Sequence, residues 1–386
     1  MNKTISIKNN IEFVPEIEEF LNPDYVYYPY NRGDKLLAKV GDNLYKEQPL
    51  LEQNGEIIYS SISGTLIGTT GSMLLKNEEV NCLVIENNYK ETVKNKKGAV
   101  KYINEYTKRT LLSTLRKFSS FEKLINIDSK ILIINGIDKD PYEKTYSSII
   151  NNNCTKILET IDAISSILEI ENAIFVANNH DNNNVINLTN HIGTYPNIRL
   201  KLLTDLYPNG FKELVVNNVL TKKQQNDGYM YFTVEDIYNI YTILKRVKPV
   251  TEKLITISGN CIEKSKVVSV KIGSNISEII NNCCEFIEEE YNVVTNGLIA
   301  GDSLTNINQI LTNDIRSIFL NTIDSEKSRK CINCGLCNSK CPVNLNPKYL
   351  LEHKKADHSK CINCGLCTYI CPAKINFKPH LGGKNE

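Results

Sequence analysis

The pattern of hydrophobic and polar positions changes several times along this chain. Residues 25–70 contain short apolar or alternating runs separated by turn signals at Gly41 and Asn54, which predicts a small β unit. Residues 101–127 carry apolar positions at helical spacing with Lys and Arg between them. We therefore expect a β unit followed by a helical connector.

From residue 130 the pattern becomes that of an α/β domain. Apolar runs predict three buried strands, at residues 130–135, 173–178 and 198–203. Helical periodicity covers residues 143–169, with a potential break at Asn151–Asn153, and residues 235–247, which Pro249 terminates. The alternation of strands and helices predicts a parallel sheet covered by helices.

The region after Pro249 has a different organisation. Alternating runs at 254–262 and 266–273 predict two strands, and residues 276–286 predict a helix. Residues 297–326 are mixed in character, and the polar segment 325–330 indicates a hinge. The expected fold class is a multidomain α/β protein.

The strongest chemical signal is a repeated cysteine motif near the C-terminal end. CINCGLC occurs at 331–337 and again at 361–367, and in each copy three residues separate it from Cys-Pro. Bacterial ferredoxins hold two [4Fe–4S] clusters with this spacing, and the fourth Cys of each run ligates the other cluster. The expected ligands are Cys331, Cys334, Cys337 and Cys371 for one cluster, and Cys361, Cys364, Cys367 and Cys341 for the other. Structural zinc and the disulfides of small secreted domains fit this spacing less well.

Composition adds a compartment and a charge asymmetry. The chain of 386 residues has no apolar run long enough to cross a bilayer, and its first residues lack the apolar stretch of a signal peptide, so we expect a cytoplasmic protein. The net charge is +1, but residues 327–386 carry 11 Lys and Arg against 3 Asp and Glu. The rest of the chain therefore carries 34 of the 45 basic residues and 41 of the 44 acidic residues. A basic tail offsets anionic clusters and suits an acidic redox partner, whereas nothing else indicates nucleic-acid binding.

These features resemble the family of the C subunit of the Rnf electron-transport complex, whose relatives include proline-reductase-associated electron-transfer proteins. Besides the Cys runs, Leu345, Pro347 and Leu350 match a family pattern between the clusters. The resemblance implies a series of domains. Residues 1–248 would hold a barrel-sandwich hybrid (1–90), a helical connector (91–128) and a Rossmann-like α/β domain similar to the complex I flavin subunit (129–248). A β-grasp domain (249–296), a linker (297–326) and an α-helical dicluster ferredoxin-type domain (327–386) would follow.

The same resemblance implies a flavin and nucleotide site in the α/β domain. The sequence NGIDKDPY at 135–142 follows the first strand where the family has Asn-Gly-Ala-Glu-Cys-Glu-Pro-Tyr. The implied residues for binding FMN and NADH are Asn135, Gly136, Asp138, Asp140 and Tyr142. Tyr207-Pro208-Asn209-Gly210 matches a second family motif.

One departure from the family concerns the flavin phosphate. Flavin-binding members carry a Gly-rich loop before the Asn-Gly strand, and such loops cradle phosphate with backbone N–H groups. Residues 109–130 contain no Gly. We therefore predict that the α/β domain does not hold FMN tightly.

We interpret the chain as an iron–sulfur electron-transfer protein that relays single electrons through two clusters to a partner reductase of the proline-reductase type. The alternative is an NADH-oxidising, FMN-dependent subunit of an Rnf-type, membrane-associated ferredoxin:NAD oxidoreductase complex. A third interpretation is a purely peripheral subunit of such a complex, bound at the cytoplasmic face of the membrane through its partners. Flavin content separates the first two, and co-purification with membrane subunits separates the third.

Overall fold

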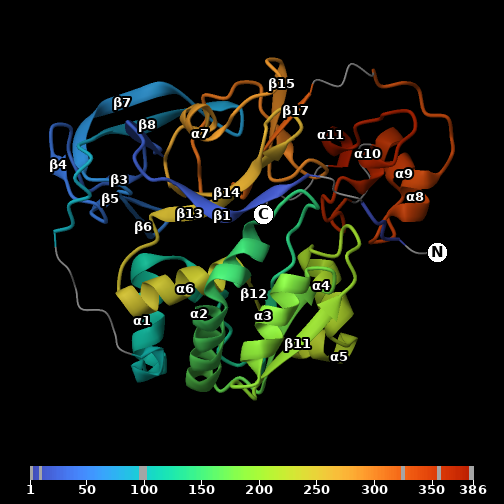
Figure 1. The fold of residues 1–386 in the computed structure, drawn as a ribbon, viewed down its shortest axis with the longest axis horizontal. Helices are drawn as coiled ribbons and strands as arrows, with labels where there is room; N and C mark the ends of the chain where they lie inside the picture. The colour runs from blue at the N-terminus through green and yellow to red at the C-terminus, as the bar shows by residue number, and fades with distance from the viewer. Residues whose placement is uncertain (1–2, 8–10, 95–101, 323–326, 354–357, 382–386) are drawn as a thin grey trace.

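A computed structural model describes residues 3–7, 11–94, 102–322, 327–353 and 358–381 (Figure 1). Among these residues, the strands form one six-stranded sheet, two four-stranded sheets and one three-stranded sheet. None of the described helices is both long enough and apolar enough to cross a membrane. In Figure 1 the two smaller antiparallel sheets lie at one end of the molecule and the red Cys-rich segment at the other.

The N-terminal part consists of two small antiparallel sheets around a shared apolar core. The first has the order β2 (Tyr25–Pro29), β8 (Glu78–Asn87), β7 (Gly64–Leu75) and β4 (Asn43–Leu44). The second has the order β3 (Lys35–Leu36), β5 (Pro49–Gln53) and β6 (Glu56–Tyr59). The turn between β5 and β6 has positive φ at both Asn54 and Gly55, as a tight two-residue hairpin requires.

The six-stranded sheet is assembled from distant parts of the chain. Its order is β1 (Phe13–Phe20), β14 (Ser265–Lys271), β13 (Glu252–Gly259), β17 (Ser317–Thr322), β15 (Tyr291–Thr295) and β16 (Asp302–Ser303). Helix α7 (Ile276–Cys283) packs on it through Ile276, Ile279 and Ile280.

This sheet corrects two expectations. The segment 297–326 is not a simple linker, because β16 and β17 lie within it and β17 pairs between β13 and β15. The sheet also extends beyond residues 249–296 on the N-terminal side, because β1 pairs in parallel with β14. The part of the hinge 325–330 that precedes residue 327 lies outside the described residues.

The α/β part is a parallel sheet covered by helices, as the alternation of strands and helices predicts. Its order is β11 (Ile198–Leu203), β10 (Asn172–Asn178), β9 (Ile131–Asn135) and β12 (Met230–Thr233), with every pair parallel. Its helices are α1 (Lys108–Phe118), α2 (Thr145–Leu168), α3 (Asn182–Ile192), α4 (Lys212–Val219), α5 (Lys222–Asp227) and α6 (Val234–Arg246). Two short 3-10 turns, Ile103–Glu105 and Phe121–Leu124, flank α1.

In this α/β part, the break in α2 agrees with the sequence pattern, whereas one strand of the sheet was not predicted. Helix α2 has non-helical dihedral angles at Asn153, where the run of three Asn residues predicts a break. Strand β12 lies beside the central strand β9, and the sequence pattern did not identify it. Large apolar side chains from α1, α2 and α6 cover one face of the sheet, and side chains from α4 cover the other.

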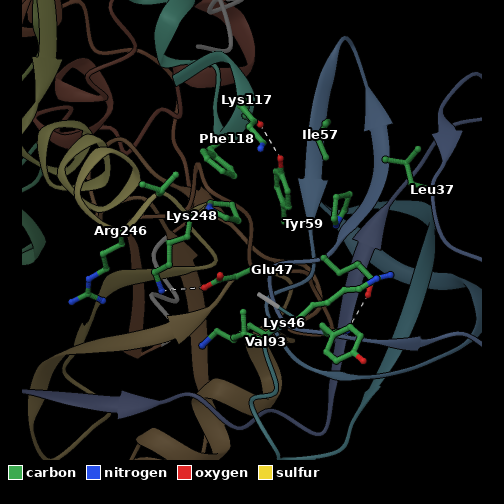
Figure 2. A pocket seen from close by; sticks show the side chains of 16 residues that line it. Leu37, Lys46, Glu47, Ile57, Tyr59, Val93, Lys117, Phe118, Arg246 and Lys248 are labelled. Atoms are coloured by element: carbon green, nitrogen blue, oxygen red, sulfur yellow. Dashed lines mark hydrogen bonds and ion pairs between the residues drawn. The ribbon is translucent and has the colours of Figure 1, made fainter. Parts of the chain in front are cut away.

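Several sets of contacts attach the N-terminal sheets to the rest of the chain, and two of them matter here. The Tyr59 ring of β6 packs against the Phe118 ring at the end of α1, with the ring centres 6.0 Å apart, and the Tyr59 hydroxyl donates to the Lys117 carbonyl at 2.8 Å (Figure 2). These contacts place a seam between the N-terminal sheets and the C-terminal ends of α1 and α6.

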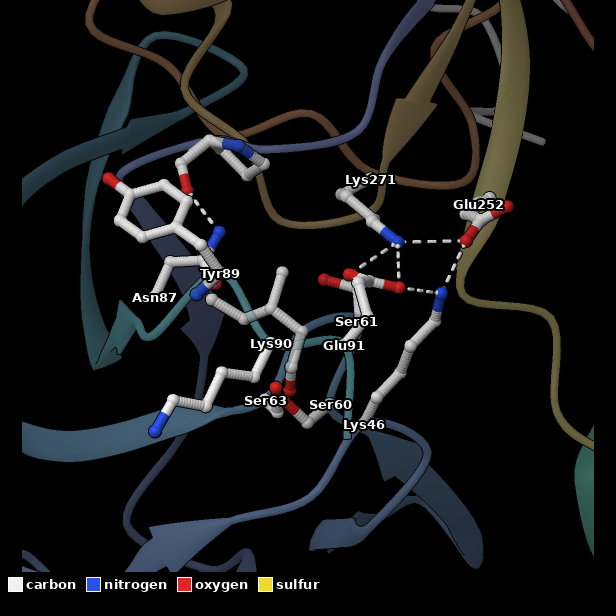
Figure 3. A network of polar contacts seen from close by, with 12 residues as sticks. Lys46, Ser60, Ser61, Ser63, Asn87, Tyr89, Lys90, Glu91, Glu252 and Lys271 are labelled. Atoms are coloured by element: carbon white, nitrogen blue, oxygen red, sulfur yellow. Dashed lines mark hydrogen bonds and ion pairs between the residues drawn. The ribbon is translucent and has the colours of Figure 1, made fainter. Parts of the chain in front are cut away.

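The second attachment is an ion network of two Lys and two Glu side chains (Figure 3). Lys271 of β14 is fully buried and contacts Glu252 at 2.8 Å and Glu91 at 3.0 Å, while Lys46 contacts the same two carboxylates. Burial would raise the pKa of Glu252, but the ammonium groups of Lys271 and Lys46 outweigh it and lower the pKa to about 2. The network therefore joins the N-terminal part to the six-stranded sheet through ionised side chains.

In the C-terminal segment, residues 327–353 and 358–381 form four short helices. They are α8 (Leu336–Lys340), α9 (Pro347–Glu352), α10 (Leu366–Tyr369) and α11 (Lys378–Leu381). A small core of Leu350, Ala373, Ile375 and Phe377 lies between them, and four of the motif cysteines pack against this core. The two halves of the repeat are thereby held side by side, with α8 in contact with α10.

Candidate functional site

The first cysteine cavity combines three thiols of the first motif with one of the second. Cys331, Cys334, Cys337 and Cys371 line it, together with apolar side chains of the small core. The loop is tightly curved because Asn333 and Gly335 both adopt positive φ. The Asn333 N–H donates to the Cys331 sulfur at 3.4 Å, a contact that also orients the thiol.

The second cavity has the reciprocal composition. Cys361, Cys364, Cys367 and Cys341 line it, and the Leu345 N–H donates to the Cys341 sulfur at 3.3 Å. The structure thus brings together the same two sets of four cysteines that the motif spacing predicts. Their ligation of clusters remains a prediction.

The chemistry of these donors fits iron–sulfur clusters. Within the described ranges, no three Cys, His, Asp or Glu side chains are arranged to hold a single metal ion. Burial raises the pKa of the Cys364 and Cys367 thiols to about 12, so their ionisation at neutral pH requires a bound cation. Four thiolates around a cavity, with backbone N–H groups donating to sulfur, match the donors by which proteins hold [4Fe–4S] clusters.

The two cavities differ in their surroundings. Cys331 and Cys334 of the first motif are exposed, whereas Cys364 of the second is buried. The second motif is held against the body of the protein: the Tyr207 hydroxyl donates to the Cys364 carbonyl, and Leu366 packs with Tyr207 and Phe211.

Two further contacts hold the second motif to the loop after β15. A Cβ atom at Gly365 would lie 2.0 Å from the Ile299 carbonyl oxygen, so only glycine permits this close approach. The Lys378 ammonium donates to the Ala300 and Gly301 carbonyls at 3.0 and 2.9 Å and to the Asp302 carboxylate at 2.6 Å. The second cavity therefore faces the body, and the first faces solvent.

The residues implied for flavin and nucleotide binding lie at one edge of the parallel sheet. A pocket at the carboxyl ends of β9, β10 and β11 includes Gly136, Asp138 and Asp140 in its lining. This edge is where open α/β sheets bind ligands. Tyr207, which touches the second Cys motif, also lines this pocket, so the pocket and the second cavity are adjacent.

The two aspartates are engaged by the protein itself. Asp138 accepts hydrogen bonds from the Tyr146 N–H at 2.7 Å and from the Ser147 hydroxyl at 2.9 Å, which caps the first turn of α2. Asp140 accepts from the Tyr142 and Ile299 N–H groups at 3.0 Å each. Burial, reinforced by the nearby Glu143 carboxylate, raises the pKa of Asp138 to about 6 and that of Asp140 to about 7.

The other implied residues also make internal contacts. The buried Asn135 side chain donates to the Gly210 carbonyl at 3.0 Å and accepts from the Ile137 N–H at 3.0 Å. The Tyr142 ring packs on Phe319 of β17, with ring centres 5.3 Å apart. Segment 135–142 therefore links the parallel sheet, the six-stranded sheet and the loop that supports the second cavity.

None of the described residues that line this pocket belongs to the segment where the family carries its Gly-rich phosphate loop. Residues 109–130, where the Gly-rich loop is expected, contain most of α1 and the 3-10 turn Phe121–Leu124, and none of them lines the pocket. Helix α1 begins with a capping box between Thr107 and Thr110. In this pocket FMN would therefore have to be held without the family's phosphate-binding loop.

Sequence reasoning missed the supporting contacts of the second cavity. Ile299 and Lys378 gave no motif signal, because their roles depend on contacts between distant segments. Ile5 was also missed: it forms an antiparallel bridge with Tyr207, beside the pocket. Tyr207 belongs to a recognised motif, but its contact with Cys364 could not be read from the sequence.

Two family models match the chain. The Nuo51 FMN-binding domain matches residues 111–245, and the 4Fe-4S dicluster domain matches residues 323–372. The first agrees with the parallel sheet and its helices, and the second covers both copies of CINCGLC.

Curated relatives are C subunits of oxidoreductase complexes. The C subunit of the proton-translocating ferredoxin:NAD(+) oxidoreductase complex of Clostridium ljungdahlii is 27% identical over 231 residues, which cover 57% of this chain and 50% of that protein. The C subunit of the ion-translocating oxidoreductase complex of Haemophilus influenzae (strain PittEE) is 24% identical over 63% of this chain and 39% of that protein. The corresponding protein of Buchnera aphidicola subsp. Acyrthosiphon pisum is 24% identical over 86% and 73%. The chain thus spans half or less of the length of the first two of these relatives.

The fold is shared with solved structures. A chain of NAD+-reducing [NiFe]-hydrogenase in the H2-reduced state superposes with a TM-score of 0.52 and 10% sequence identity, covering 72% of this chain and 62% of that chain. At this identity the likeness concerns the fold alone. Together with the family models and the curated relatives, the motifs show that the chain is a homologue of the C subunits of the Rnf, or ion-translocating oxidoreductase, complexes.

Proposed function

We propose that this chain is an iron–sulfur subunit of an ion-translocating oxidoreductase complex and passes single electrons through two [4Fe–4S] clusters. The observation that carries this proposal is the pair of cavities, each lined by three cysteines of one motif and one of the other. The names of the curated relatives favour such a complex over the proline-reductase-type partner that was our first interpretation.

The surroundings of the cavities suggest a route for electrons. When bound, the clusters would supply one-electron redox chemistry, while the chain fixes their positions. Tyr207 and Phe211 pack against Cys364 and Leu366 and bury this side of the second motif. The second site adjoins the α/β pocket, and the first presents Cys331 and Cys334 to solvent. Electrons would therefore pass between the body and an external partner at the first site.

The partner at the first site should be acidic. Lys348 lines the first cavity, and Arg329 is tied to it through a backbone hydrogen bond to Ala373 at 2.9 Å. The tail as a whole has an excess of basic residues. Complementary charge speeds the encounter of redox proteins and orients them.

The test is anaerobic purification of the tagged chain from its native host. The chain should contain about eight irons, two clusters' worth, and should be recovered with membrane-embedded subunits. Recovery from the soluble fraction alone, together with a separate reductase, would contradict the complex and restore the carrier interpretation.

A second candidate is the NADH-oxidising, FMN-dependent form of this subunit. The match of residues 111–245 to the Nuo51 FMN-binding domain favours it, and so does the pocket at the carboxyl ends of the strands. The absence of residues 109–130 from the pocket lining argues against it. Release and quantification of flavin from the same preparation decides: about one FMN per chain supports the second candidate, and none supports a subunit that works without flavin.

A further inference from the structure

A pocket of about 780 Å³ lies in the seam between the three-stranded sheet and the C-terminal ends of α1 and α6 (Figure 2). It shares no lining residue with the two Cys cavities or with the pocket of the α/β domain. Small-molecule sites are typically about 300–1,000 Å³ in volume. The seam pocket is therefore large enough for a ligand of nucleotide size.

Among the charged side chains that line the seam pocket, basic ones outnumber acidic ones. Lys46, Lys94, Lys117, Arg246 and Lys248 line it, and Glu47 is the acidic residue among the lining side chains. Lys248 pairs with Glu47 at 3.1 Å, and Lys46 is held by the carboxylates of the ion network.

Helix electrostatics account for only part of this positive charge. Lys117 and Arg246 lie in the last turns of α1 and α6. Each helix end carries a partial charge of roughly −0.5, which these residues offset. Lys94 lies on no helix and adds a further charge at the pocket. The balance is positive, which favours an anionic ligand.

The walls of the pocket are apolar and aromatic. Figure 2 shows the Tyr59 and Phe118 rings next to each other at one side of the pocket. The planes of the two rings make an angle of 46°. Leu37, Tyr45 and Ile57 also line it, and each leaves more than a third of its surface exposed. Apolar side chains that remain exposed together, beside charged groups, are typical of a binding surface.

Backbone strain is concentrated at the same place. Val247 has φ 52° and ψ 47°, a left-handed conformation that a β-branched residue rarely adopts. Glu47, across the pocket, also has positive φ, at 66°. These two positions hold the Glu47–Lys248 ion pair across the seam (Figure 2). Strained residues of this kind cluster at ligand sites, where the surrounding structure enforces them.

We infer that the seam pocket binds a small anion that carries a planar ring, of the nucleotide class. The Tyr59 and Phe118 rings offer apolar surface to the ring of the ligand, and Lys94, Lys117 and Arg246 offer charge-assisted hydrogen bonds to its phosphates. This site is separate from the clusters and goes beyond the proposed function.

The test uses the full-length protein and isothermal titration calorimetry with ADP, with adenosine and inorganic phosphate as partial probes. ADP should bind saturably and more tightly than either partial probe. The double variant Arg246→Gln/Lys94→Gln should weaken ADP binding by about tenfold or more, since two charge-assisted contacts are removed. The matched variant Arg199→Gln/Lys201→Gln, on the exposed edge strand β11, should leave binding unchanged.

Three results would overturn the inference. The first is the absence of saturable ADP binding up to about 1 mM, the weak limit of specific recognition. The second is equal weakening by the two double variants. The third is loss of binding on Lys139→Gln/Lys144→Gln, which alters the α/β pocket, together with no effect of Arg246→Gln/Lys94→Gln. Iron content, measured in parallel, should be the same in all variants, which separates this site from the proposed electron relay.

Discussion

The two motif glycines provide a matched pair of substitutions with different expected outcomes. Gly335 and Gly365 occupy equivalent positions in the two CINCGLC copies and have nearly the same φ, 73° and 69°. A Cβ at Gly335 meets nothing within 4 Å, whereas at Gly365 it would lie 2.0 Å from the Ile299 carbonyl oxygen. Alanine at either site therefore introduces backbone strain, but only Gly365→Ala also collides with the body of the protein.

The magnitudes follow from these contacts. The left-handed conformation costs an alanine about 1–2 kcal/mol. Relief of the contact with Ile299 requires a backbone shift of about 1 Å, and overpacking of this kind costs about 1–3 kcal/mol more. If iron is lost through local opening, the extra cost of about 1–3 kcal/mol corresponds to release from the second site that is about 5-fold to 160-fold faster than in Gly335→Ala.

The assay is the rate of iron release to a chelator under anaerobic conditions, followed by cluster absorbance and electron paramagnetic resonance. Wild-type protein sets the baseline, and Gly335→Ala controls for backbone strain alone. Gly365→Ala should lose one cluster selectively and early. Equal rates for the two alanine variants would refute the claim that the second motif is held against the loop at Ile299.

The remaining predictions concern the ion network and the basic tail. Lys271→Met should lower the free energy of unfolding by about 2 kcal/mol, less than for a fully buried pair because Glu91 and Glu252 keep about a third of their side-chain surface in solvent. The control Lys35→Met, at the exposed ion pair with Glu52, should cost at most about 1 kcal/mol in the same urea titration. Because the pKa of Glu252 is lowered to about 2, the stabilising contribution of its carboxylate is complete above the ordinary Glu pKa and disappears as the pH falls towards 2. The free energies of unfolding of wild type and Glu252→Gln should therefore converge at acid pH, and a difference that stays constant with pH would contradict this. Electron transfer to the physiological partner should slow as salt rises, because exposed charges are screened over about 10 Å at 0.1 M, and a rate that does not depend on salt would indicate apolar docking.

Local patterns were sufficient to predict several parts of the structure. The apolar runs at 130–135 and 173–178 lie in the neighbouring parallel strands β9 and β10, where burial on both faces leaves a clear signature, and the run at 198–203 forms the edge strand β11 beside them. The two cysteine sets were predicted from spacing alone, because a short loop around a cluster restricts where its ligands can lie along the chain.

Non-local pairing explains what could not be predicted. Strand β1 pairs with β14, about 250 residues later in the chain, and β17 is inserted between β13 and β15. Such strands are defined by their neighbours in the sheet more than by their own residues. The contact of Tyr207 with Cys364 and the seam pocket have the same origin, because each is formed where separate parts of the fold meet.

The most direct test of the electron relay compares four cysteine variants by electron paramagnetic resonance after anaerobic reconstitution and reduction. Cys334→Ala removes a ligand of the first cavity and Cys364→Ala a ligand of the second, so each provides the reference spectrum of the cluster that remains. The account predicts that wild type holds two clusters, that Cys341→Ala gives the Cys364→Ala spectrum, and that Cys371→Ala gives the Cys334→Ala spectrum. If Cys341→Ala instead gives the Cys334→Ala spectrum, or if wild type holds a single cluster, the proposed arrangement of ligands is wrong.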